Sequence, residues 1–329
     1  MSGIRSLREK FSPFRVRVRN DNVPGSARVK RAILIVVVLV AAVIGSGLWY
    51  FRSTNTRLTG LPIVLPVIGD GIARTQLPKR PRAIVVIIEE NKSAKEINGD
   101  ADSSQYIHTL AGRSAIMTHS NGIAHPSQPN YFALFAGVND TNGDTCPAAG
   151  VAPDAPNLGA ELIAAHRTFR AYSEDQPSPG FTGCTAGQYA RKHAPWTNFT
   201  NIPRASWVPF SDLHAYEELP DVAFIVPNLV HDMHSASIED GDAWLHAHVD
   251  PLIAWANAHD ALVILTWDES SSPRTNHIPT FFIGPMVRPG RYDEPISHYN
   301  VLRTIEDLEG TTHAGHAATS APILDIWRK

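Results

Sequence analysis

Five short strand candidates restrict the fold class of this chain, and several of them are continuously apolar. Each is rich in β-branched or aromatic residues, and longer segments of helical character separate them. Strands of this kind are buried on both faces, which is typical of a parallel sheet covered by helices on each side. The sequence therefore predicts a three-layer α/β fold with a predominantly parallel sheet. The expected strands are residues 83–88, 169–173, 222–227, 261–267 and 278–284, and the expected helices are 157–166, 238–259 and 298–310.

A run of 20 uncharged residues, 32–51, precedes this pattern. As a helix it would be about 30 Å long, the thickness of a bilayer core. Basic residues abut its first end and Trp49 and Tyr50 mark the other, as in a membrane anchor. A buried core helix and a cleaved signal peptide are the alternatives, but no small-x-small cleavage site follows the run. We expect an uncleaved transmembrane helix.

The charge distribution divides the chain further. Residues 1–31 carry nine Lys or Arg against two acids, a net charge of +7, whereas the whole chain has −3. The positive-inside rule then predicts a basic cytoplasmic segment 1–31, an anchor 32–51, a Pro- and Gly-rich tether 52–82 and an extracytoplasmic domain 83–329. The protein is thus expected in the cell membrane. The basic segment is a topology signal or a contact for anionic lipid headgroups.

Nucleic-acid binding is not expected, because the exported part carries −10 and shows no basic stripe. The oligomeric state is left open. Cys146 and Cys184 are the chain's two cysteines. Export would permit a disulfide between them, two unpaired thiols are the alternative, and their spacing does not suit a zinc site.

Polar side chains follow three of the expected strands. Ligands of open α/β sheets collect beyond the carboxyl ends of the strands. Crowded carboxylates repel one another unless a cation lies among them, so a divalent metal is expected at this edge. Oxygen ligands suit Mg, Ca or Mn, and histidines extend the choice to Zn or Fe. The candidates are Glu90 and Asn91, then His231, Asp232 and His234, then Asp268 and Glu269, with His277 before the last strand.

Ser127 lies in the stretch HPSQPNYFALFAG, directly before a helix candidate that has Pro129 in its first turn. The free amides and positive dipole end of a helix N-terminus suit a phosphate oxygen. Ser127 is either a helix N-cap or a nucleophile, and a neighbouring cation would favour the nucleophile.

Seven motifs, in order from about residue 84 to 310, resemble a phosphoesterase family. That family contains bacterial phospholipases C and acid phosphatases and belongs to the alkaline phosphatase superfamily. The loop SSSPRTNH after TWDE is poorer in glycine than is usual there, and the chain is shorter than the secreted phospholipases. The motifs are EENKS, HPSQPNY, YARKHAPW, HDMH, LTWDE, HIPTFFIGP and SHYNVLRTIEDL.

The resemblance implies an alkaline phosphatase-like fold and assigns roles to matching positions. The implied metal ligands are Glu90, Asn91, Ser127, Asp268 and Glu269, with Ser127 as the nucleophile. His193, His234 and His277 would be catalytic and, with Asp232, would bind the substrate phosphate. The roles of His125 and His231 are left open.

The expected function is metal-dependent hydrolysis of a small-molecule or lipid phosphoester through a phosphoserine on Ser127. The compact size favours a phosphomonoesterase of the acid phosphatase type. A phospholipase C that acts on phospholipid diesters and a catalytically silent, metal-stabilised surface binding module are the alternatives.

Overall fold

The structure is a computed structural model and describes residues 77–272 and 274–328. The predicted cytoplasmic segment, the predicted anchor and most of the predicted tether lie outside these residues. Across the described ranges, none of the helices combines the length and the apolar character that a membrane crossing requires.

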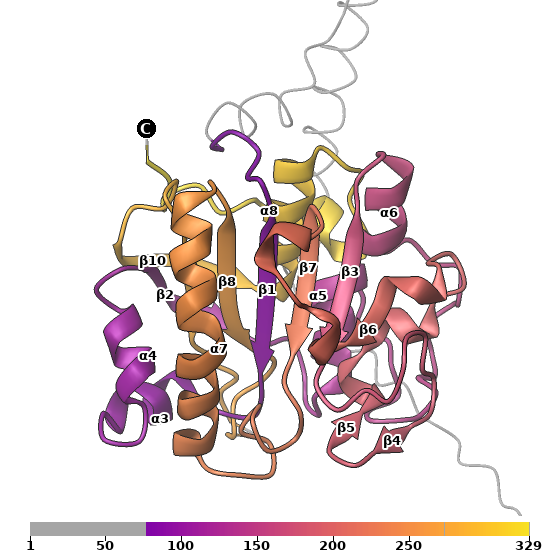
Figure 1. Cartoon of the computed structure of the whole chain (residues 1–329), viewed down its shortest axis with the longest axis horizontal. Helices are drawn as coiled ribbons and strands as arrows, with labels where there is room; N and C mark the ends of the chain where they lie inside the picture. The colour runs from indigo at the N-terminus through magenta and orange to yellow at the C-terminus, as the bar shows by residue number, and fades with distance from the viewer. Residues whose placement is uncertain (1–76, 273, 329) are drawn as a thin grey trace, which may run out of the picture. The chain divides into compact units, whose positions relative to one another are not determined.

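An eight-stranded sheet forms the middle layer of the domain, in the order β10-β2-β9-β8-β1-β7-β3-β6 (Figure 1). Strand β9 runs antiparallel to β2 and β8, and the other neighbouring pairs are parallel. The prediction of a predominantly parallel sheet is confirmed. The strands are β1 (Ile84–Glu89), β2 (Ala115–Asn121), β3 (Phe169–Ser173), β6 (Trp207–Pro209), β7 (Val222–Val226), β8 (Leu262–Trp267), β9 (Thr280–Ile283) and β10 (Gly290–Ser297).

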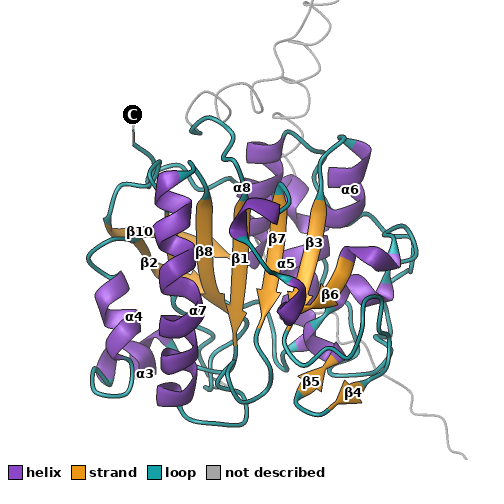
Figure 2. Ribbon diagram, in the orientation of Figure 1, coloured by secondary structure: helices purple, strands orange, loops and turns teal. Residues whose placement is uncertain are grey.

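Helices cover both faces of the sheet, which makes three layers (Figure 2). Alternate residues of β1 point to opposite faces: Ile84, Val86 and Ile88 belong to one hydrophobic cluster, and Val85 and Ile87 to the other. Helices α5 (Gln128–Ala136), α6 (Leu158–Ala164) and α8 (His298–Glu309) pack in the first cluster. Helices α3 (Ala94–Gly99), α4 (Gln105–Leu110) and α7 (Ile238–Ala258) pack in the second. The two clusters explain why the central strands are apolar throughout.

The five predicted strands and three long predicted helices are present, with ends that differ by at most two residues, and the helix predicted after Ser127 is α5. Strands β2, β6 and β10 of this sheet and helices α3 and α4 were not predicted. The sequence assigns residues 77–82 to the tether, but this segment contacts the domain. Arg80 forms an ion pair with Asp221 (Nη1 to Oδ1, 2.6 Å), and the Arg82 amide donates to the carbonyl of Asp260 (2.8 Å).

The predicted disulfide is confirmed: Cys146 and Cys184 are bonded, with their Cα atoms 5.7 Å apart. Cys184 precedes a small hairpin of β4 (Thr185–Ala186) and β5 (Tyr189–Ala190). The amide of Arg191 returns to the Cys184 carbonyl at 3.0 Å. The bond therefore connects the segment after α5 to the residue that directly precedes this hairpin.

Two carboxylic acids lie close together between α6 and α8: Glu161 belongs to α6 and Glu306 to α8. Burial raises the pKa of Glu306 to about 9, and the neighbouring charge of Glu161 adds to this effect. Burial also raises the pKa of Glu161 to about 7. Glu306 Oε1 accepts a hydrogen bond from the Ala314 amide (2.8 Å), which fixes its position.

We predict that Glu306 makes the fold less stable as the pH rises. A carboxyl whose pKa is raised on folding stabilises the fold fully below the unfolded value, near 4.5, and loses this contribution up to about pH 9. Glu306→Gln retains the acceptor for Ala314 and removes the ionisation. At pH 9 the free energy of unfolding of this variant in urea should exceed that of the unmodified protein by on the order of 2 kcal/mol. At pH 4.5 this gain should be absent. The control is Glu239→Gln, at an exposed position. An unchanged pH dependence in Glu306→Gln would contradict the assignment.

Candidate active site

The loops after β1, β7 and β8 meet at the carboxyl edge of the sheet, which is the lower edge in Figure 1. Backbone hydrogen bonds lock these loops together: the Glu90 amide donates to the Asp232 carbonyl (2.7 Å), and the Asp268 amide to the Glu89 carbonyl (2.9 Å). Asn91 and Met233 have positive φ angles of 50° and 72°, which non-glycine residues adopt at a cost. The three strand ends therefore form one rigid platform.

Ser127 lies at the N-terminus of α5 and is 2% exposed. Its hydroxyl donates toward two carboxylates, Glu90 Oε2 at 2.9 Å and Glu269 Oε1 at 3.2 Å. It forms no side-chain capping hydrogen bond with the helix. Residues from β1, α5 and β8 thus meet at one hydroxyl group, and the interpretation of Ser127 as a capping side chain is wrong.

The first three residues of this helix offer no free amide. The Gln128 amide donates to Asp144 Oδ1 (2.9 Å), Pro129 has no amide hydrogen, and the Asn130 amide donates to the Ser127 carbonyl (2.9 Å). The expectation of free amides at this helix end therefore does not hold for residues 128–130.

The carboxylates around Ser127 perturb one another. Burial raises the pKa of Asp268 well above its usual value, and the charges of Glu90 and Glu269 add to the shift. Burial and the charge of Glu90 raise the pKa of Glu269 to about 7. Burial also acts to raise the pKa of Glu90, but the neighbouring His193 and His234 outweigh it and lower the value to about 2. The negative charge of the group therefore concentrates on Glu90.

His193 lies between two of the acids. Its Nε2 is 3.0 Å from Glu90 Oε1, and its Nδ1 is 3.3 Å from Asp232 Oδ2. Burial lowers the pKa of His193, but the charge of Glu90 and the hydrogen bond to Asp232 raise it to about 9. Tyr131 stacks on the ring, with centroids 4.9 Å apart, an arrangement that favours a cation. The carboxylates of Glu90 and Asp232, one on each side of the ring, thus favour the protonated form of His193.

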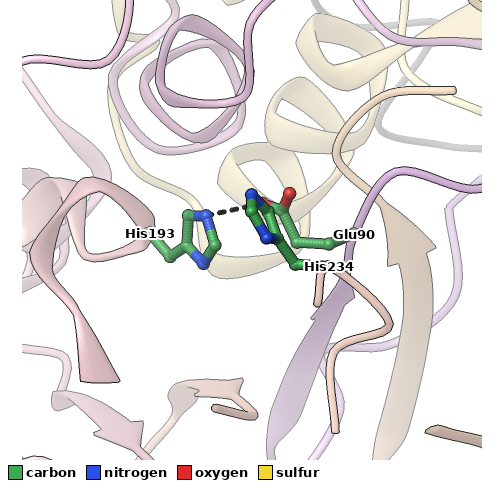
Figure 3. Close-up of side chains that lie close together, drawn as sticks. All are labelled: Glu90, His193 and His234. Atoms are coloured by element: carbon green, nitrogen blue, oxygen red, sulfur yellow. Dashed lines mark ion pairs between the residues drawn. The ribbon is translucent and has the colours of Figure 1, made fainter. Parts of the chain in front are cut away.

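His234 completes a compact group with Glu90 and His193 (Figure 3). One ligand atom of each residue lies within 4.8 Å of the others, so the three could hold a metal ion. His234 Nε2 is 3.2 Å from Lys192 Nζ, and its amide donates to Asp232 Oδ1 (2.8 Å). The sequence analysis assigned both histidines to catalysis and phosphate binding rather than to a metal.

Three other residues singled out from the sequence make their hydrogen bonds with partners other than Ser127. The ring of His277 donates from Nε2 to the carbonyl of Thr118 (2.8 Å). The side chain of Asn91 donates to Glu90 Oε2 (2.8 Å), and its backbone amide donates to Asp268 Oδ1 (3.1 Å). His231, whose role the sequence left open, forms an ion pair with Glu174 (Nδ1 to Oε2, 2.9 Å).

The donor set fits a divalent cation. Oxygens of Glu90, Ser127 and Glu269 converge, and Asp268 Oδ2 is buried without a hydrogen-bond partner among the described residues. A buried, unpaired carboxylate oxygen is costly unless a cation or a proton lies beside it. These oxygens suit a hard or borderline ion, and the adjacent imidazoles widen the choice.

Sequence reasoning missed two residues of this site. Lys192 contacts His234, and Asp144 contacts both Lys192 (Nζ to Oδ2, 2.8 Å) and the first turn of α5. Lys192 stands beside His193 in the motif YARKHAPW, so a search for a cation near that motif could have found it. Asp144 follows no strand and carries no comparable signal. His125, whose role was left open, pairs with Glu269.

Comparisons with known proteins identify the family and the fold of this chain. Residues 100–311 match the model of the Phosphoesterase family. The chain is 43% identical over 306 residues to a phosphatidylinositol-3-phosphatase of Mycobacterium tuberculosis, covering 91% of this chain and 95% of that protein. It is 29% identical to an acid phosphatase of Aspergillus fumigatus, covering 69% of this chain and 55% of the fungal protein. A solved alkaline phosphatase superfamily protein from Vibrio parahaemolyticus has a similar fold, with a TM-score of 0.53, 13% identity, and coverage of 72% and 68% of the two chains.

The fold and these matches define a phosphoric ester hydrolase with an alkaline phosphatase-like α/β domain. The chain belongs to the phosphoesterase family. The family assignment and the enzyme class drawn from the sequence are confirmed, and the alternative of a silent binding module has no support.

We predict that His193 is required for stability as well as for the site. Its replacement by Gln leaves Glu90 and Asp232 buried without a cation between them, and removal of one partner of a buried pair typically costs about 3–5 kcal/mol. Urea unfolding at pH 7 in the presence of a chelator would measure this loss with metal excluded. The exposed His214→Gln should change stability by less than about 0.5 kcal/mol. Equal stability of the two variants would show that His193 does not compensate the acids.

Proposed function

We propose that this protein is a metal-dependent phosphomonoesterase in which Ser127 is the nucleophile. The observation that carries the proposal is the pair of contacts from the buried Ser127 hydroxyl to Glu90 and Glu269. A serine hydroxyl is a weak nucleophile unless an acceptor takes its proton or a cation stabilises its alkoxide. Both requirements can be met by the groups around Ser127.

The proposed metal ligands are Glu90, Ser127, Asp268 and Glu269, with Asn91 fixing the first and third of these through its own hydrogen bonds. The overlapping group of Glu90, His193 and His234 offers a second way to hold an ion beside the same carboxylate. When bound, the metal would lower the pKa of the serine hydroxyl and offset the negative charge of the phosphate.

In the proposed reaction, Ser127 Oγ forms a bond to phosphorus while the bond from phosphorus to the leaving oxygen breaks. The hydroxyl proton has two carboxylate acceptors within reach, at 2.9 and 3.2 Å. The resulting phosphoserine is hydrolysed by water, which gives orthophosphate and regenerates the serine. We propose that His234, which groups with Glu90, lies next to the bound phosphate and assists the developing charge there.

The proposal of a monoester substrate is supported by the relatives. The similar proteins from Mycobacterium tuberculosis and Aspergillus fumigatus are named as a phosphatidylinositol-3-phosphatase and an acid phosphatase. A lipid or small-molecule phosphate monoester therefore suits this chain better than the phospholipid diester of the phospholipase C alternative.

We also propose that the domain acts outside the cytoplasm. The Cys146–Cys184 disulfide supports this location, because disulfides persist in oxidising compartments. The uncharged run 32–51 remains the proposed anchor to the membrane.

We predict that Ser127→Ala lowers kcat for p-nitrophenyl phosphate by at least about 10³-fold, because the covalent route is lost. Circular dichroism should show an unchanged fold, since the substitution removes one oxygen atom. Ser211→Ala, at an exposed position, is the matched control and should retain full activity. Undiminished turnover by Ser127→Ala would exclude this residue as the nucleophile.

We predict that removal of the metal abolishes turnover and lowers the melting temperature, because the buried carboxylates would repel one another without it. Dialysis against a chelator followed by addition of single divalent metals would identify the ion, with elemental analysis of the active protein alongside. Glu90→Gln should lose the thermal response to added metal. Full activity in protein free of divalent metal would refute the proposed dependence.

A further inference from the structure

The side chain of Lys192 extends to the site from the short 3-10 helix Arg191–His193. Its ammonium Nζ is 2.8 Å from Asp144 Oδ2 and 3.2 Å from His234 Nε2. The side chain is 23% exposed, so it lies at the solvent side of the buried acids. The other lysine close to these loops, Lys92, uses its ammonium to donate to the carbonyl of Met233 (2.7 Å).

Asp144 fixes Lys192 relative to the nucleophile. One of its carboxylate oxygens accepts from the Lys192 ammonium, and the other accepts from the amide of Gln128, the residue after Ser127. The side chain of Gln128 exchanges two hydrogen bonds with the backbone of Thr145, at 2.9 and 3.1 Å. A single carboxylate therefore connects the ammonium to the first turn of the helix that carries Ser127.

The chain around Lys192 is held on its other side as well. The guanidinium of Arg191 donates to the carbonyl of Thr182 (2.6 Å) and, through Nε, to the hydroxyl of Thr197 (2.9 Å). The Cys146–Cys184 disulfide joins the Asp144 segment to the segment that leads to Arg191. Lys192 thus has the fixed position of a binding group rather than the freedom of a surface lysine.

A phosphate monoester poses an electrostatic difficulty for this site. Near neutral pH it carries two negative charges, one more than a diester, and it must approach buried carboxylates. A fixed ammonium near the phosphate offsets the additional charge, and the electrostatic gain is larger in a partly buried site than in water. An ammonium has three N–H donors, and the contacts with Asp144 and His234 account for two of them.

We propose that Lys192, oriented by Asp144, donates to a non-bridging oxygen of the substrate and makes the site selective for dianionic phosphate monoesters over monoanionic diesters. This inference rests on the proposed function, because it places the phosphate on Ser127. The side chain of Lys192 would then determine whether the site prefers a monoester or a diester.

The test compares Lys192→Gln, Lys192→Arg and the unmodified full chain, each with its metal, on p-nitrophenyl phosphate and bis(p-nitrophenyl) phosphate. For Lys192→Gln, kcat/KM for the monoester should fall by about 10²- to 10³-fold, the effect of removing one charged donor from a transition state. Its kcat/KM for the diester should fall by less than about 5-fold, because a diester lacks the second charge. Lys192→Arg should recover part of the preference for the monoester. Lys95→Gln, at an exposed position of α3, is the control and should match the unmodified protein on both substrates.

Equal losses on both substrates, or no loss on the monoester, would overturn the inference. A second measurement decides the matter if diester turnover is too slow to follow. In this measurement, orthophosphate is titrated calorimetrically into Ser127→Ala and into the double variant Ser127→Ala with Lys192→Gln. The double variant should bind orthophosphate at least about 10-fold more weakly, because it lacks one charge-assisted hydrogen bond. Equal affinity would refute the role of Lys192. The proposed function fails separately, if Ser127→Ala alone retains turnover.

Discussion

The site depends on the burial of several like charges around one hydroxyl group. Glu90 and Glu269 contact the Ser127 hydroxyl at the carboxyl edge of the sheet, and Asp268 is buried near both, where solvent does not screen their repulsion. Such a cluster is stable only with compensating protons or cations. His193 supplies one cation from within, between Glu90 and Asp232, and the proposed metal would supply another. The same requirement that makes the cluster costly also makes it suited to polarise a serine.

Much of the fold could be predicted because the central strands are apolar on both faces. Strands β1, β7 and β8 are fully buried, so their sequences differ from those of any exposed segment. Strand β10 alternates exposed and half-buried residues and contains Pro295, which is typical of the edge of a sheet, and it is defined by its pairing with β2. Such pairing is set by distant parts of the chain and leaves no continuous apolar run.

The candidate site divides in the same way. The meeting of Glu90 with Asp268 and Glu269 follows from the rule that ligands collect at the carboxyl ends of strands, which needs only the order of strands and loops. The directions of the side chains could be predicted less well from the sequence. His277 points to the carbonyl of Thr118 because of its local pairing beside β2, and no motif reveals that orientation. Lys192 contacts His234 while Asp144 holds its ammonium group in place, and neither contact can be inferred from the sequence.

The disulfide has a consequence for how the protein is handled. It lies outside both hydrophobic clusters of the sheet, yet it ties the Asp144 segment to the turn whose Cys184 carbonyl receives the Arg191 amide. In protein produced in a reducing cytosol, the segments around Asp144 and Arg191 would be held together by hydrogen bonds and the Asp144–Lys192 ion pair, without the covalent bond. The melting temperature and the substrate selectivity would then measure different parts of the protein. A normal melting curve would not show that the selectivity is intact.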